Sequence, residues 1–354
     1  MLQRRCRRVP IVLALLVIAA SPQRVDARIT VRMLALPPRA IIDVTGARAL
    51  MAVSRDGTIA ATVIVNGYRT RPVVWNAANR ARALTQSGSI VSFDRAGGLL
   101  LDAGRPLRAN GTNLRAVDLS ACEAFPHDSI GPVLAGELEN GALIASMRSP
   151  AIVDLDDTSG QNAPVALYMR SGRCLNLGNG IAVGTAGMFA VGYTAFINNV
   201  PAPSNVVSSR EQFTAMRWHE RERQPLGSGV ALAINAAGAA VGADVPTGRG
   251  TYDAVPHAKF WSAPGAVVEL APNAQASVAY AIDADNRIAG MLEESGRHYA
   301  FIWKNRTLMR LDDVVASPGW RFECAYAFTP TGGVVGIGTY RGRAAAYDLE
   351  GLTL

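Results

Sequence analysis

Ala231-Leu232-Ala233-Ile234-Asn235-Ala236-Ala237-Gly238-Ala239-Ala240-Val241-Gly242 is the clearest copy of a phrase that recurs along this chain of 354 residues. Its residue 238 is an anchor from which seven copies can be aligned, at Gly57, Gly97, Gly141, Met188, Gly238, Asn286 and Gly332. Successive anchors are 40, 44, 47, 50, 48 and 46 residues apart. Self-similarity at this period indicates one supersecondary unit that is repeated seven times.

Three columns of the aligned units predict a tight turn between two strands. Five residues before the anchor, the side chain is mostly small: Ala52, Ser92, Gly136, Val183, Ala233, Ala281 and Ala327. Two positions later, six of seven side chains can hydrogen-bond to nearby backbone: Ser54, Asp94, Leu138, Thr185, Asn235, Asp283 and Thr329. The anchor is Gly or Asn in six units, and these residues tolerate a positive φ.

The rest of each unit predicts three more strands. A short apolar run such as Ala240-Val241-Gly242 follows the turn, and a third strand ends in an aromatic residue in every unit but the second. These aromatic residues are Trp75, Tyr168, Trp218, Trp261, Trp303 and Tyr347. A brief turn then leads to an outer strand such as Val267-Val268-Glu269-Leu270. We expect the large rings to wedge between neighbouring sheets.

The units therefore predict an all-β fold, a β-propeller of about seven four-stranded blades. The segment Ile29–Leu34 reads as a fourth strand with no first three before it, while the last unit ends soon after Tyr347. We expect this N-terminal strand to complete the final blade and close the ring, which leaves no sheet edge at the junction. The alternative is an open β-solenoid with caps.

The phrase at 231–242, followed by His257-Ala258-Lys259-Phe260-Trp261, resembles the HAF repeat of bacterial extracellular repeat proteins. Units five to seven match it well, unit four moderately, and units one to three in outline. The resemblance implies an exported, propeller-like protein. It transfers no catalytic or binding residue to this chain.

The N-terminus predicts export. Arg4 to Arg8 form a basic stretch, and the apolar run from Val9 to Ala20 is too short to span a bilayer as a helix. We assign residues 1–27 to a signal peptide, cleaved after Ala27 or after Ala20, and residues 28–354 to a single propeller domain. The expected location is periplasmic or extracellular, and no later segment predicts a membrane span.

The charge of the chain argues against one class of partner, and the cysteines predict which residues form a disulfide. The formal charge of +7 includes five Arg and one Asp of the signal, which leaves 35 − 5 = 30 basic and 28 − 1 = 27 acidic residues. Clustered bases with interleaved aromatics are lacking, so nucleic acid is not an expected partner. Of the three remaining cysteines, Cys122 and Cys174 are the preferred disulfide pair, and we expect Cys324 to pack in a strand.

Two segments are candidate sites on the face of the ring where the connections vary most in length. Tyr193, Phe196, Asn198 and Asn199 combine aromatic rings and amides in what reads as a loop, and such groups suit a sugar or a peptide. The alternative is that Tyr193 and Phe196 continue a strand and anchor the loop after it. Asp154, Asp156 and Asp157 concentrate oxygen ligands of the kind that Ca²⁺ takes, and Ca²⁺ is the one possible cofactor.

No catalytic residue can be assigned, because the chain has no G-x-S-x-G elbow and no H-E-x-x-H pair. The favoured function is an exported binding module, a monomer that recognises a glycan or a protein partner through the variable face. One alternative is an extracellular hydrolase or lyase that acts on a polymer or a phosphoester with carboxylates on that face. The other is a structural protein of the cell surface.

Overall fold

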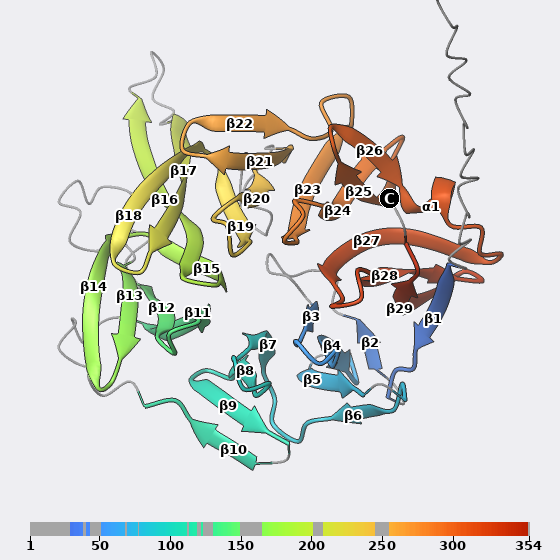
Figure 1. The fold of residues 1–354 in the computed structure, drawn as a ribbon, viewed down its shortest axis with the longest axis horizontal. Coiled ribbons are helices and arrows are strands. Elements are labelled where there is room, and N and C mark those ends of the chain that lie inside the picture. Colours follow the sequence, from blue (N-terminus) through green and yellow to red (C-terminus); the bar gives the residue numbers. More distant parts are fainter. Residues whose placement is uncertain are drawn as a thin grey trace, which may run out of the picture.

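Seven antiparallel sheets stand side by side around a central axis, which confirms the predicted seven-bladed β-propeller (Figure 1). The computed structural model describes residues 29–37, 40–42, 51–67, 69–76, 78–111, 113–118, 122, 130–148, 165–200, 208–244 and 255–352. Within these residues the single helix is α1 (Leu311–Val314). No helix of the described residues is long and apolar enough to cross a bilayer.

We number the sheets as blades in chain order, from the inner to the outer strand. Blade 1 has β3 (Met51–Val53), β4 (Ile59–Val65), β5 (Arg69–Trp75) and β6 (Ala81–Ala83), with β2 (Ala40–Ile42) beside the second half of β4. Blade 2 has β7 (Ser89–Phe93), β8 (Leu99–Asp102), β9 (Pro106–Asn110) and β10 (Asn113–Ala116). Blade 3 has β11 (Ile130–Glu137), β12 (Leu143–Arg148), β13 (Val165–Arg170) and β14 (Arg173–Asn179).

Blade 4 has β15 (Ile181–Ala186), β16 (Phe189–Val200), β17 (Ser208–His219) and β18 (Glu222–Ser228). Blade 5 has β19 (Val230–Ile234), β20 (Ala240–Ala243), β21 (Ala258–Ala263) and β22 (Ala266–Glu269). Blade 6 has β23 (Ala276–Ile282), β24 (Ile288–Glu294), β25 (Arg297–Lys304) and β26 (Thr307–Arg310). Blade 7 has β27 (Trp320–Phe328), β28 (Val334–Tyr340), β29 (Arg343–Glu350) and β1 (Thr30–Leu34).

The first and the last described strands share blade 7, as predicted. Strand β1 lies antiparallel to β29, from Thr30 opposite Glu350 to Leu34 opposite Ala346 (Figure 1). Arg32 forms an ion pair with Asp348, the residue directly opposite it in the register. The open solenoid is therefore excluded, since the N-terminal strand completes the last sheet.

The repeated turn joins the first and second strands of each blade. At the anchors, φ lies between 80° and 85° for the five glycines and is 57° for Asn286. In blade 5, Asn235 Oδ1 accepts hydrogen bonds from the backbone N–H groups of Ala237 (3.1 Å) and Ala239 (3.0 Å). In blade 3, where Leu138 has no polar group, Asn140 Oδ1 accepts instead from Ala142 N at 2.9 Å. The turn therefore needs one side-chain acceptor, whichever residue supplies it.

The Asn235 side chain also joins two blades, so its loss has a testable cost. Its Nδ2 donates to the carbonyl oxygen of Asp283 and to Asn286 Oδ1, each at 2.9 Å. We expect Asn235→Ala to lower the free energy of unfolding by about 2 kcal/mol in urea titrations, because several partly buried hydrogen bonds are lost. Asn235→Ser keeps an acceptor, as Ser54 does in blade 1, and should lose about half as much. Equal stability of the Ala variant and the wild type would contradict this role.

Each inner strand of blades 2 to 7 contains a register shift that the sequence did not reveal. The shift that recurs in all six blades skips Val91, Ala135, Val183, Leu232, Tyr280 and Tyr326, and β11 and β27 each contain a second shift nearer their start. In blades 4 to 7 a glycine of the second strand faces this bulge: Gly192, Gly242, Gly290 and Gly336. A Cβ at any of the four would overlap a carbonyl oxygen of the first strand. The bulge and the glycine therefore form one recurring unit.

In blade 4 the turn between the first two strands is shorter than the sequence alignment assumed. Ala186 pairs with Phe189, so the turn has two residues, Gly187 and Met188, whereas Ile234 and Ala240 enclose five residues in blade 5. Thr185 lies within β15 rather than in the turn, and the positive φ belongs to Gly187, not to the predicted anchor Met188.

In blade 4 the position for a small side chain also lies one residue later than the sequence alignment placed it. Gly184 pairs with Val191 and takes the position that the alignment gave to Val183. A Cβ on Gly184 would lie 2.9 Å from the carbonyl oxygen of Leu232 in blade 5. The column is therefore small in every blade, because inner strands approach one another closely around the axis.

The third-strand aromatics pack as predicted. Trp75, Trp218, Trp261 and Tyr347 are fully buried, and Tyr168 and Trp303 nearly so. Gly180 and Gly229, with φ of 151° and 124°, let the chain entering blades 4 and 5 pass close to the indoles of Trp218 and Trp261. The second unit lacks a ring here: Ala109 pairs with Leu99 where Trp75 pairs with Ile59 in blade 1.

Cys122 and Cys174 form a disulfide, the pairing preferred from the sequence. Their Cα atoms are 5.2 Å apart, and the bridge ties the connection between blades 2 and 3 to the outer strand β14. Cys324 is a buried free thiol in β27. Burial raises its pKa, so the thiol stays protonated and packs as a small apolar side chain.

Candidate functional site

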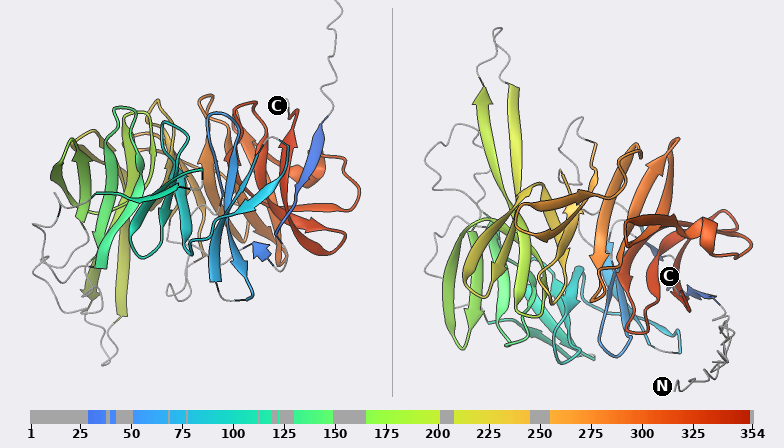
Figure 2. Two further views of the ribbon diagram at one scale, coloured as in Figure 1. Left: turned by 90° about the horizontal axis from the view of Figure 1, so that it is seen from below. Right: turned by 45° about the horizontal axis from the view of Figure 1, so that its top comes forward.

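The four residues of the first candidate segment lie in strand β16. The alternative in which Tyr193 and Phe196 continue a strand is therefore confirmed, and the loop is not. Tyr193 pairs with Ile181 and Ala215, and its ring meets Phe213 edge-on at 5.9 Å. Phe196, Asn198 and Asn199 continue the pairing of β16 with β17, which extends beyond the rest of blade 4 (Figure 2). The β-branched and aromatic residues of β16, such as Thr194 and Ile197, favour such an extension. A ligand role for these four residues stays a prediction.

The predicted cation ligands Asp154, Asp156 and Asp157 lie outside the described residues, and so does the proposed signal peptide. Among the residues that are described, no group of three or more His, Cys, Asp or Glu side chains is arranged to hold a metal ion.

The strand order defines two faces of the ring. One face, here called the turn face, carries the turns between first and second strands and between third and fourth strands. The other, here called the connector face, carries the connections between second and third strands and the passages from blade to blade. On the connector face the second-to-third connections span 149–164, 201–207 and 244–257 in blades 3 to 5, but only 295–296 and 341–342 in blades 6 and 7.

An open hollow of about 520 Å³ lies on the connector face where the chain passes from blade 6 to blade 7. We call it the Trp320 hollow. Helix α1 lies beside β26 and β27 at the rim of the ring (Figure 1) and contributes Asp312 to the lining. The lining residues are Asp312, Val315, Ala316, Ser317, Pro318, Gly319 and Trp320.

The backbone of the hollow is held from both blades. Leu311 and Val315 are buried in the apolar cluster between blades 6 and 7, which fixes the helical turn. Asp312 Oδ1 accepts a hydrogen bond from Phe322 N at 2.9 Å, and Trp320 N donates to the carbonyl oxygen of Ser317 at 3.1 Å. Gly319 adopts φ of 88°, which favours glycine, and its carbonyl oxygen accepts from Arg341 N at 2.7 Å. The lining is therefore preorganised.

Trp320 is a partly exposed ring fixed by other aromatic residues. Its ring centroid is 5.3 Å from that of Tyr340, 5.7 Å from that of Phe322, which is parallel to it within 3°, and 6.0 Å from that of Tyr347. Phe322 and Tyr347 are themselves fully buried. The indole therefore lines the hollow in a fixed position.

Charged groups beside the hollow are partly neutralised. Arg310 donates to Asp313 at 2.8 Å and to Glu294 at 2.9 Å, and the hydrogen bond to Asp313 raises the pKa of the guanidinium. Asp312 is thus the carboxylate that lines the hollow itself, together with the hydroxyl of Ser317. Apolar and aromatic side chains with a few polar groups among them are the usual lining of a small-molecule site.

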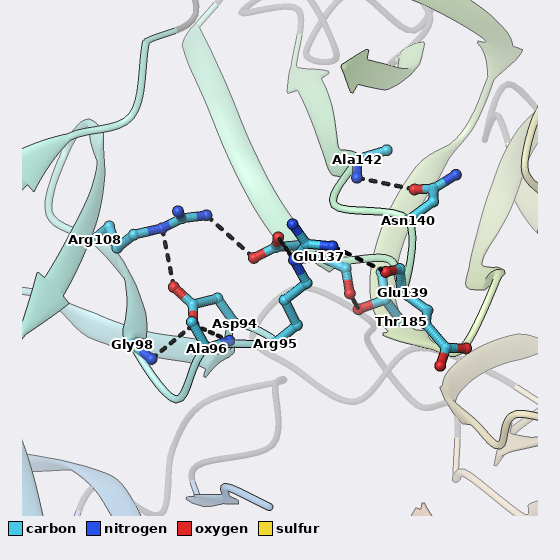
Figure 3. A network of polar contacts seen from close by, with 10 residues as sticks. All are labelled: Asp94, Arg95, Ala96, Gly98, Arg108, Glu137, Glu139, Asn140, Ala142 and Thr185. Carbon is cyan, nitrogen blue, oxygen red and sulfur yellow. Dashed lines mark hydrogen bonds and ion pairs between the residues drawn. The ribbon is translucent and has the colours of Figure 1, made fainter. Parts of the chain in front are cut away.

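A second polar cluster lies on the turn face between blades 2 and 3 (Figure 3). Arg108 contacts Asp94 and Glu137, each at 3.1 Å, and Arg95 reaches Glu137 at 3.6 Å. Both carboxylates are buried, and Thr185 of blade 4 donates to the carbonyl oxygen of Glu137 at 3.3 Å. Arg108 is adjacent to Ala109, where the aromatic wedge is missing. We interpret this cluster as a link between blades rather than as a ligand site, because each carboxylate already faces a guanidinium.

The sequence did not single out the Trp320 hollow. Trp320 belongs to the phrase Ser317-Pro318-Gly319-Trp320, which reads as a connector that ends where a strand begins. A usable signal was present, since Trp320 is the one tryptophan that falls outside the third-strand column. It therefore has no repeated packing role to explain it.

Comparisons with known proteins support the fold alone. No protein-family model and no curated protein matches the chain, so the resemblance to the HAF repeat stays a prediction. The chain is similar to the β-propeller domain of the Trilobed protease from Pyrococcus furiosus, with a TM-score of 0.55 and 9% identity over 85% of this chain and 93% of that one. That domain is described as having an open velcro topology, whereas β1 and β29 pair here.

The chain is also similar to Pyrococcus horikoshii acylaminoacyl peptidase, with a TM-score of 0.53 and 10% identity over 89% of this chain. It spans about half of that enzyme, 52% of its length. At these identities the shared feature is the propeller architecture, which hosts many unrelated activities.

Proposed function

We propose that this protein is an exported binding module that holds a carbohydrate in the Trp320 hollow. The observation that carries the proposal is the partly exposed indole of Trp320, fixed beside Asp312 and Ser317 at the wall of an open hollow. The C–H face of a sugar ring packs on a flat aromatic surface, while its hydroxyls need hydrogen-bond partners around the edge. The hollow offers both kinds of contact.

Export is part of the proposal. It is supported by the signal-like N-terminus and by the bridge between Cys122 and Cys174, because disulfides persist in oxidising compartments. A binding role fits the rigid lining, since a preorganised site loses little conformational freedom when it takes up a ligand.

An array of immobilised oligosaccharides tests the function. We expect the wild type to bind a subset of them and Trp320→Ala to weaken that binding about thirtyfold, as loss of a central aromatic contact does. Trp320→Phe keeps a flat ring and should retain most of the affinity, which separates loss of stacking from misfolding. Phe189→Ala is the matched control, because it removes a partly exposed ring from the turn face.

Two outcomes would overturn the proposal: no oligosaccharide bound by the folded wild type, or binding that Trp320→Ala leaves unchanged. Release of shortened oligosaccharides, abolished by Asp312→Asn, would favour the alternative of a hydrolase.

A further inference from the structure

We infer that the sugar held in the Trp320 hollow is acidic, a uronic acid residue whose carboxylate pairs with Arg341 and Arg343. This inference rests on the proposed function and adds the chemical class of the ligand. It is carried by two exposed arginines at the end of blade 7 that contains Trp320.

Arg341 is fixed at the rim of the hollow by three contacts. It occupies the two-residue turn between β28 and β29 with φ of 51°, and its backbone N–H donates to the carbonyl oxygen of Gly319. Its guanidinium lies over the ring of Tyr340, 5.1 Å from the centroid. A Cβ on Gly319 would approach Arg341 Cγ to 3.2 Å, so the stem of this side chain passes directly over a lining residue.

Arg343 extends the same row of side chains. In blade 7, Trp320 is paired with Tyr340, and Tyr340 is paired with Arg343. Directly paired residues of neighbouring strands project from the same side of a sheet, so the indole, the phenol ring and the guanidinium of Arg343 lie on one side. Arg343 is exposed.

The two arginines differ from Arg310 in their partners. Arg310 is held by Glu294 and Asp313, whereas no carboxylate of the described residues lies within ion-pair distance of Arg341 or Arg343. A cation that is positioned by backbone and ring contacts, but not neutralised by the protein, favours an anionic ligand. The planar guanidinium suits a carboxylate in particular, since it can donate two parallel hydrogen bonds.

The negative groups nearby set the orientation of the ligand. Asp312 would repel an anion at its own side of the hollow, and one of its oxygens is engaged by Phe322 N. Asp313 and Glu294 are compensated by Arg310. We therefore place the hydroxyls of the sugar toward Asp312 and Ser317, and the carboxylate toward Arg341.

Titration calorimetry with matched ligands tests this assignment. The ligands are oligosaccharides of galacturonate, glucuronate and mannuronate as free acids, and the same oligosaccharides as methyl esters, which keep the ring and lose the charge. We expect one free acid to bind about 10- to 100-fold more tightly than its ester, with an advantage that shrinks as salt is raised. Arg341→Gln should remove the preference, and Arg343→Gln should reduce it.

Arg321→Gln is the matched control, because Arg321 neighbours Trp320 in β27 but projects from the opposite side of the sheet. Equal binding of acid and ester, with both lost in Trp320→Ala, would overturn the acidic ligand and leave the proposed function intact. Binding of a neutral oligosaccharide alone would do the same. Failure of every ligand, charged or neutral, would overturn the proposed function itself.

Discussion

Replacing Arg32 with methionine is expected to lower the free energy of unfolding by about 3 kcal/mol at pH 7, because it leaves a buried carboxylate without its partner. The side chain of Asp348 is 2% exposed, and Arg32 Nε donates to its Oδ2 at 3.0 Å. The other oxygen, Oδ1, is buried without a hydrogen bond. Because Arg32 lies in β1 and Asp348 in β29, the pair acts across the closure of the ring.

The cost of Arg32→Met should depend on pH. Burial raises the pKa of Asp348, and Arg32 opposes that shift. A carboxyl whose pKa is higher in the folded state holds its proton more tightly there, so its contribution favours folding at low pH and is lost as pH rises through the folded pKa. Without Arg32 the pKa rises further, so the difference between variant and wild type should be greatest near neutral pH and shrink as Asp348 becomes protonated in acid.

Urea unfolding of Arg32→Met, Asp348→Asn and the double variant measures the coupling between Arg32 and Asp348. Asp348→Asn removes the charge, so adding Arg32→Met in that background should cost less than about 1 kcal/mol. An Arg32→Met variant as stable as the wild type at pH 7 would show that β1 does not close blade 7 as described.

Gly242→Ala is expected to destabilise the protein by about 3 kcal/mol or more, since an added Cβ would overlap the carbonyl oxygen of Val230 in the paired strand. The backbone of β19 cannot move aside easily. Its bulge at Leu232 is fixed by the pairs on either side, Ala231 with Gly242 and Ala233 with Val241. The thermal midpoint and the urea midpoint should both fall.

Gly57→Ala provides the comparison. Gly57 has φ of 81° and no atom near the position of an added Cβ, so this variant isolates the cost of a left-handed backbone, about 1 to 2 kcal/mol. If Gly242→Ala costs no more than Gly57→Ala, the bulge does not constrain the second strand in the way that we infer.

The repeat allowed much of the fold to be predicted because its key residues act locally. Asn235 and Asp283 open turns with their own backbone neighbours, and Trp218 and Trp261 occupy the same place in successive units. The alignment failed at Met188 because blade 4 has a two-residue turn, and loss of three residues there is invisible when anchors are matched by residue type. The bulges were missed because they depend on pairing between strands.

The candidate site was only partly within reach of the sequence. The choice of the connector face agrees with the position of the Trp320 hollow, but the residues predicted there, Tyr193 and Phe196, extend a strand of blade 4 instead. The hollow depends on contacts between α1, β27 and the turn at Arg341, which are brought together by the packing of blade 6 on blade 7. No local sequence pattern encodes these contacts between blade 6 and blade 7.

A crystal structure of the protein with a bound uronic acid oligosaccharide would decide whether the Trp320 hollow is the ligand site. We expect a sugar ring stacked on the indole of Trp320, with its carboxylate against the guanidinium of Arg341. A sugar bound on the turn face, or along β16 and β17, with the Trp320 hollow empty at saturating ligand, would contradict it.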